Sequence, residues 1–162
     1  MPFWFPAAPV EVTLNPFEVR ICNAIAKARA EHKNGQGASS KMRDGRTDIE
    51  ATIQAFGAEL AFCRIANLYP ELDVSDEYGG ADCISVDGKK VQIKQTEYPT
   101  GRLQVADYQG ADRCDIYVLM IGKLPRYKYV GYTLAERLFI PDRIGDLGRG
   151  KAYLMDQVDL IK

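Results

Sequence analysis

The feature that most constrains the fold is an unbroken apolar run in the second half of the chain. Residues 116–121 read Ile-Tyr-Val-Leu-Met-Ile and follow directly after Asp115. A strand with one face in water would alternate apolar and polar residues, so this run indicates a strand that is buried on both faces. The chain has 162 residues, which is long enough to build a core without metal or disulfide cross-links.

Patterns elsewhere place helices before strands. Residues 1–14 are rich in proline and predict an irregular arm. Capping-box patterns at Asn15 and Thr47 start two helices, which are expected to end near residues 32 and 68. Short strands are expected at 82–86, 91–95, 115–121 and 127–132, a short helix at 133–138, and an ambiguous last strand within 152–161.

This order predicts the α/β class, with helices packed on a mixed β-sheet. No internal repeat and no linker divides the chain, so we expect a single domain. Within it, residues 1–46 form an N-terminal arm, a basic helix and a flexible loop that pack on the core. Residues 47–162 form the core itself.

The net charge of −1 hides a basic segment. Residues 20–46 contain seven basic and two acidic residues. Such an excess is suited to phosphate groups, although a solvated helix face and loop explain it equally well. The candidate nucleic-acid-binding residues in this segment are Lys41, Arg43 and Arg46.

Cysteine and histidine usage argues against a zinc site. The four cysteines form no Cys-x-x-Cys pair, and His32 is the single histidine. No stretch of about 18 apolar residues is present, and the start of the chain lacks the basic region of a signal peptide. We therefore expect no membrane association, reduced cysteines in the core and a cytoplasmic location.

One acidic residue interrupts the apolar side of the second predicted helix. At about 100° per residue, Glu59 lies among residues such as Phe62, Cys63 and Phe56. A buried carboxylate needs a cation, a metal ion or strong hydrogen-bond donors. A functional carboxylate and a buried ion pair with an arginine or lysine are equally compatible with this position.

The predicted hairpin adds further polar groups. Gln92 and Lys94 share one face of a strand, and Asp82 opens the strand before it. Asp87-Gly88 predicts the turn. A two-residue turn would pair Asp82 with Ile93, whereas a three-residue loop would pair Asp82 with Lys94. The three polar side chains come together in the second register, or with a bend near Asp82 that has the same effect.

These residues resemble the PD-(D/E)XK nuclease superfamily, which has the restriction-endonuclease-like fold. The similar segments are Gly57-Ala58-Glu59-Leu60-Ala61-Phe62, Val91-Gln92-Ile93-Lys94-Gln95-Thr96, the strand from Asp115, and Val130-Gly131-Tyr132. Together they cover roughly residues 47–135. The context of these motifs is similar to that in small phage and prokaryotic members of the superfamily.

The resemblance implies a catalytic set of Glu59, Asp82, Gln92 and Lys94. It places a Mg²⁺ ion, with Mn²⁺ as a substitute, on Glu59, Asp82, Gln92 and the backbone carbonyl of Ile93. Gln92 stands where an acidic residue is usual, which resembles the variant seen in Mrr-like restriction enzymes.

The expected function is therefore that of a Mg²⁺-dependent DNA nuclease, specifically an endonuclease, acting in the host cytoplasm if it is encoded by a phage. A catalytically inactive DNA-binding protein of the same fold is the alternative, and Gln92 is its best support. A structural protein with an internal ion network ranks third. The sequence leaves open whether the protein forms a homodimer.

Overall fold

The predicted doubly buried strand forms β5 (Ile116–Lys123), the middle strand of a five-stranded sheet with the order β1-β6-β5-β3-β2. The structure is a computed structural model that describes residues 4–35, 48–73, 80–107, 113–148 and 150–162. β5 runs parallel to β3 and antiparallel to β6, so the sheet is mixed and the predicted α/β class is confirmed. The other strands of this sheet are β1 (Val10–Thr13), β2 (Cys83–Ile84), β3 (Lys90–Thr96) and β6 (Arg126–Leu134).

Both faces of β5 are covered, as its sequence predicts. Val118 and Met120 belong to a hydrophobic core beneath the helices. Leu119 and Ile121 point to the opposite face and join a second core. All four side chains are buried, which explains why this strand lacks a polar alternation.

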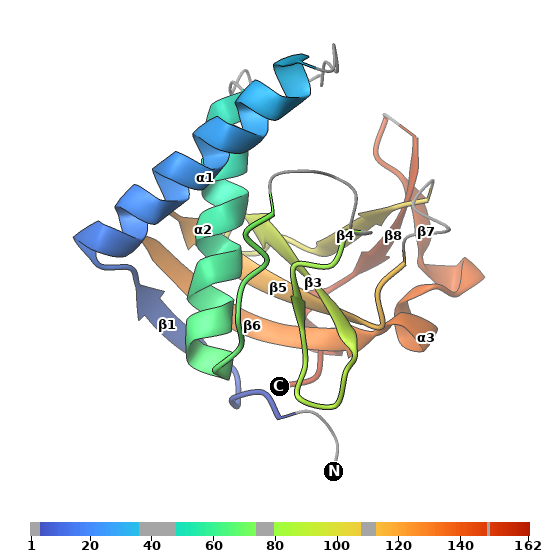
Figure 1. Cartoon of the computed structure of the whole chain (residues 1–162). Helices are drawn as coiled ribbons and strands as arrows, with labels where there is room; N and C mark the ends of the chain where they lie inside the picture. The colour runs from blue at the N-terminus through green and yellow to red at the C-terminus, as the bar shows by residue number, and fades with distance from the viewer. Residues whose placement is uncertain (1–3, 36–47, 74–79, 108–112, 149) are drawn as a thin grey trace.

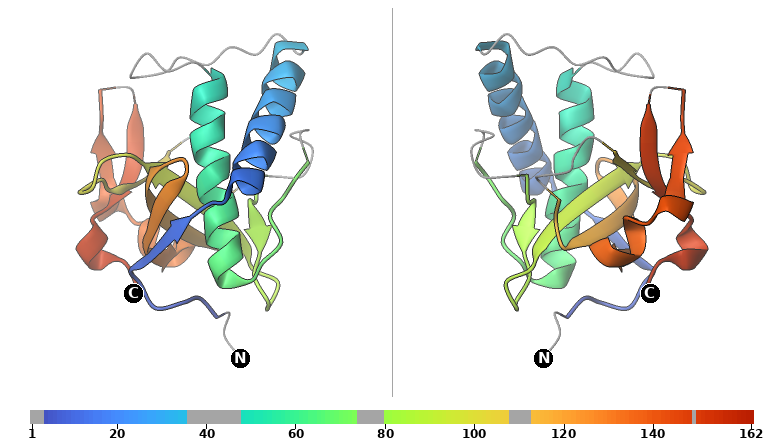
Figure 2. Two further views of the ribbon diagram at one scale, coloured as in Figure 1. Left: turned by 90° about the vertical axis from the view of Figure 1, so that its left-hand side faces the viewer. Right: turned by 90° about the vertical axis from the view of Figure 1, so that its right-hand side faces the viewer.

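Two long helices form the layer on one face. α2 (Asp48–Ala66) lies against the sheet, and α1 (Pro16–Gly35) crosses over α2 on its outer side (Figures 1 and 2). Asn67 ends α2 in the left-handed conformation, with a φ of 56°. In the part of the chain that the structure describes, no helix is long and apolar enough to cross a membrane.

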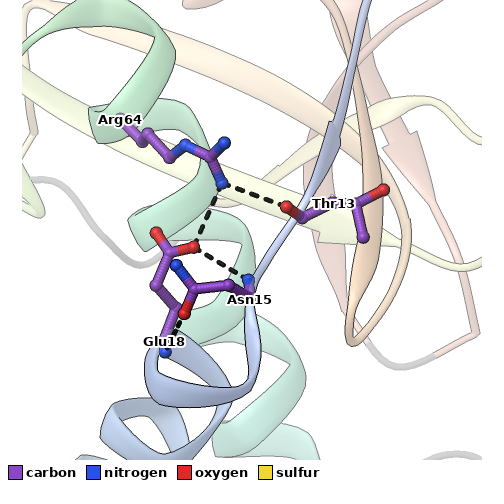
Figure 3. Close-up of polar contacts among 4 residues, drawn as sticks. All are labelled: Thr13, Asn15, Glu18 and Arg64. Carbon is purple, nitrogen blue, oxygen red and sulfur yellow. Dashed lines mark hydrogen bonds and ion pairs between the residues drawn. The ribbon is translucent and has the colours of Figure 1, made fainter.

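The predicted capping box fixes the start of α1. The Asn15 side chain accepts the amide of Glu18 at 2.9 Å, and Glu18 Oε1 accepts the amide of Asn15 at the same distance. Arg64 near the end of α2 donates to Glu18 Oε1 and to the carbonyl of Thr13 (Figure 3). The beginning of α1 is thereby joined to the end of α2.

A second, smaller sheet covers the other face of the main sheet. Its order is β4-β8-β7, all antiparallel, and α3 (Ala135–Leu138) lies beside it (Figure 1). The ambiguous last strand is confirmed as β8, whereas β4 and β7 were not predicted. The strands are β4 (Leu103–Ala106), β7 (Ile144–Asp146) and β8 (Lys151–Met155), with short 3₁₀ turns at Pro141–Arg143 and Gln157–Asp159.

The expectation of an irregular N-terminal arm is wrong for Val10–Thr13. These residues form β1 and pair with β6, with Val10 opposite Tyr129 and Thr13 opposite Arg126. Their alternation is only four residues long and lies between prolines, so tertiary pairing rather than local propensity makes the strand. The N-terminal part is consequently built into the main sheet as well as into the helical layer.

Candidate functional site: a carboxylate pair at the sheet edge

Glu59 lies in the middle of α2 on the side that faces the sheet. Its side chain is buried, as predicted, with only 6% of the residue exposed. Phe56, Phe62 and Cys63 around it are fully or almost fully buried and belong to the core beneath the helices. An acidic side chain in this position carries a desolvation cost unless cations or donors compensate it.

Asp82 stands just before β2, at the edge of the main sheet. Its amide donates to the carbonyl of Val91 at 2.9 Å, although Cys83 is the residue paired with Val91. Two residues thus face one, as in a β-bulge, and the chain bends at Asp82. The Asp82 carboxylate then accepts the amide of Ile93 at 2.7 Å. The carboxylate thus replaces the backbone carbonyl that would accept this hydrogen bond if β2 were longer.

Neither predicted hairpin register is correct. Ile84 pairs with Lys90, and the loop consists of Val86, Asp87 and Gly88 between Ser85 and Lys89. Gly88 adopts a φ of 85°, as expected for a type I turn followed by a bulge. The bend at Asp82 directs its carboxylate to β3. Such a bend is the expected alternative to a register that pairs Asp82 with Lys94.

The carboxyl groups of Glu59 and Asp82 influence the ionisation of each other. Burial, followed by the negative charge of Asp82, raises the pKa of Glu59 well above its usual range. Burial also raises the pKa of Asp82 to about 6, despite the opposing effects of the Ile93 amide and of Lys94. The positive charges near the pair therefore do not fully compensate the cost of ionising the two carboxyl groups.

Arg29 of α1 contributes to this site as the kind of basic partner expected for a buried Glu59, although no local pattern singles out this residue. Its Nη1 lies 3.7 Å from Glu59 Oε2, which is an ion pair but too long for a hydrogen bond. Its Nη2 donates to the carbonyl of Glu71 at 3.1 Å, and the guanidinium lies 5.0 Å from the centre of the Phe56 ring. The contact joins residues 30 positions apart, which no local pattern reveals.

Lys94 and Gln92 occupy β3 and are partly buried. Val91 and Ile93 pack beneath α2, so strand alternation places Gln92 and Lys94 on the other face, as predicted. Burial lowers the pKa of Lys94, while the charge of Asp82 gives the largest opposing effect. The lysine is electrostatically coupled to the carboxylate pair through Asp82.

The donor atoms at this edge fit a hard divalent cation. Glu59 Oε2 is buried and has no hydrogen-bond partner. The carbonyl of Ile93 points to the same edge as its amide, toward Asp82, because both groups of a strand residue point the same way. Within the described ranges, His, Cys, Asp and Glu side chains form no group of three that could hold a metal ion. Carbonyl and water oxygens must therefore complete any coordination shell, as is usual for Mg²⁺.

The predicted phosphate-binding residues Lys41, Arg43 and Arg46 lie outside the described residues.

The cysteines behave as predicted: Cys22, Cys63, Cys83 and Cys114 are all buried and form no disulfide. Burial raises the pKa of Cys22 and of Cys114 to about 11, so these thiols stay protonated at neutral pH.

No known protein family matches this chain, and no curated protein shows significant sequence similarity to it. Function must therefore be inferred from the site itself.

Proposed function

We propose that this protein is a Mg²⁺-dependent DNA nuclease with a restriction-endonuclease-like core. The observation that carries the proposal is the pair of buried Glu59 and half-buried Asp82, with Lys94 interacting electrostatically with both. Two adjacent carboxyl groups with raised pKa values are costly to a fold and typical of functional sites.

The arrangement of elements supports the same proposal. The helix that carries Glu59 packs on the sheet, the hairpin β2–β3 carries Asp82 and Lys94, and β5 runs parallel to β3 as the next strand of the sheet. β6 then returns antiparallel to β5. This is the order of elements that the resemblance to the PD-(D/E)XK superfamily implies.

The residues that would hold Mg²⁺ are Glu59, Asp82 and the Ile93 carbonyl, with Gln92 as an uncharged oxygen donor. When bound, Mg²⁺ would supply Lewis-acid activation of water and of a phosphodiester oxygen. The two carboxylates must be ionised for this role. A bound cation favours their ionised form and so reverses the effect of burial on both groups.

Lys94 is the general acid–base and electrostatic residue in this proposal. Its ammonium can donate to a water positioned for attack and to a non-bridging phosphate oxygen as negative charge develops there. Because burial lowers its pKa, Lys94 also releases a proton more readily than an exposed lysine. Substrate phosphates further along the backbone would be held by the basic residues Lys41, Arg43 and Arg46.

A cleavage assay with supercoiled and linear DNA tests the proposal. We expect cutting in Mg²⁺ or Mn²⁺, no cutting in EDTA, and at least about a hundredfold loss of rate in Glu59→Gln. Glu136→Gln, which changes an exposed acid on α3, is the matched control and should retain the wild-type rate. Intact DNA under all metal conditions would overturn the nuclease proposal.

Gln92 favours one alternative, a DNA-binding protein of the same fold without catalysis. A glutamine leaves two carboxylates where three are usual, and Arg29 already neutralises part of their charge. Retained, salt-dependent DNA binding together with absent cleavage in Mg²⁺ and Mn²⁺ would establish this alternative instead.

A further inference from the structure

Arg29 and a divalent cation would compete for the same oxygen atom. Glu59 Oε2 faces Arg29 Nη1 at 3.7 Å, is buried, and accepts no hydrogen bond. It is thus the carboxylate oxygen of Glu59 that remains available to a metal ion. Two positive charges on opposite sides of one oxygen repel each other strongly in a buried site.

Arg29 cannot simply swing into solvent when a cation arrives. The hydrogen bond to the Glu71 carbonyl and the stacking on Phe56 hold its guanidinium in place, and its side chain is only 21% exposed. The amide of Glu71 in turn donates to the carbonyl of Asp82 at 2.8 Å. Arg29 is therefore fixed to the chain segment that positions the second carboxylate.

We infer that Arg29 is a resident counter-ion of the carboxylate pair, which partly neutralises it without metal and weakens the binding of a divalent cation. This inference rests on the cation site proposed above. It assigns to α1, which lies outside the region of family resemblance, direct control over metal affinity. The site then fills only at metal concentrations high enough to overcome the arginine.

Titration calorimetry with Mn²⁺ alone, without DNA, tests the inference. We expect Arg29→Met to bind Mn²⁺ about tenfold more tightly than the wild type, because a nearby unit charge is removed. Methionine retains a long apolar side chain that can cover Phe56. Arg29→Lys keeps the charge and should stay within about threefold of the wild type.

Two control variants separate a local effect of Arg29 from a general change in charge, and both from loss of the cation site. Arg20→Met removes the same charge from an exposed position on α1, where Arg20 lies 5.4 Å from the Phe17 ring, and should leave Mn²⁺ affinity unchanged. Glu59→Gln should abolish or greatly weaken binding. If Glu59→Gln binds Mn²⁺ as tightly as the wild type does, the proposed cation site itself is wrong.

The inference about Arg29 fails in a different way. If Glu59→Gln loses Mn²⁺ but Arg29→Met binds it no more tightly than the wild type, Arg29 is not a competing counter-ion. If Arg29→Met does not fold, Arg29→Gln provides the neutral variant, and the same comparison with Arg29→Lys decides the question.

Discussion

The carboxylate pair is the residue-scale feature around which the protein is organised. Glu59 and Asp82 come from a helix and from a strand edge, and the charge of Asp82 adds to the cost of burying an ionised Glu59. Arg29 and Lys94 reduce this cost but do not remove it, since both carboxyl pKa values stay raised. A purely structural ion network would be expected to balance its charges more fully.

This imbalance predicts how stability depends on pH. A carboxyl group whose pKa is raised in the folded state contributes stability below its unfolded pKa, near 4, and loses it as pH rises through the folded value, about 6 for Asp82. The ionised group then costs up to ~3 kcal/mol at neutral pH.

We therefore expect Asp82→Asn, measured in EDTA at pH 7.5, to unfold at a temperature equal to or above that of the wild type. The asparagine oxygen can still accept the Ile93 amide, and the advantage of the variant should shrink toward pH 4. Thermal unfolding of both proteins at several pH values measures this. Strong destabilisation of the variant at pH 7.5 would favour the structural ion network.

At the scale of single elements, the close packing of α2 on the sheet determines where Glu59 can lie. A side chain at Gly57 would overlap the Tyr127 hydroxyl, and Leu124 Cδ1 would lie 3.0 Å from the added carbon. That hydroxyl donates to the carbonyl of Gln54 at 2.9 Å. The glycine two residues before Glu59 thus lets α2 approach β6 closely.

Gly57→Ala should destabilise the protein by about 1–3 kcal/mol, because the added methyl group forces the helix or Tyr127 to move. Tyr127→Phe removes the overlapping oxygen, so the double variant should regain part of the loss. Denaturant unfolding of the two single variants and the double variant measures this coupling. If the effects of the two substitutions are additive, the contact with Tyr127 is not the reason why residue 57 must lack a side chain.

The elements also show how far sequence reasoning reaches. The α1 capping box, the burial of Glu59 and the strand β5 follow from local patterns, and the structure confirms each of them. The strands β1, β4 and β7 have only three or four residues, and the partners of β1 and β4 are distant in sequence. Such strands carry too little local signal to be predicted with assurance.

At the scale of the whole molecule, the candidate site joins the N-terminal part of the chain to the core. Arg29 comes from the N-terminal part, Glu59 from the inner helix, and Asp82 and Lys94 from the edge of the sheet. Glu59 stands out in the sequence because it lies on the apolar side of a predicted helix, whereas Asp82 and Lys94 stand out through the hairpin pattern and the family resemblance. Arg29 carries no such signal, because a contact between two helices depends on how they cross, which no motif records.

The whole fold also explains why the site lies at an edge. β2 has only two residues, so β3 continues past Cys83 and exposes the amide of Ile93 to the Asp82 side chain. The bend at Asp82 and the short edge strand together bring the Asp82 carboxylate to β3, where Lys94 interacts with it electrostatically.

Cleavage of DNA by Lys94→Met tests the central claim most directly. Methionine keeps the length of the side chain and removes its charge, so substrate binding should survive while the rate in Mg²⁺ falls by about two orders of magnitude or more. The melting temperature should stay within a few degrees of the wild type. Lys89→Met, an exposed lysine of the same hairpin, should cut at the wild-type rate. If Lys94→Met cleaves DNA as fast as the wild type, the assignment of this site is wrong.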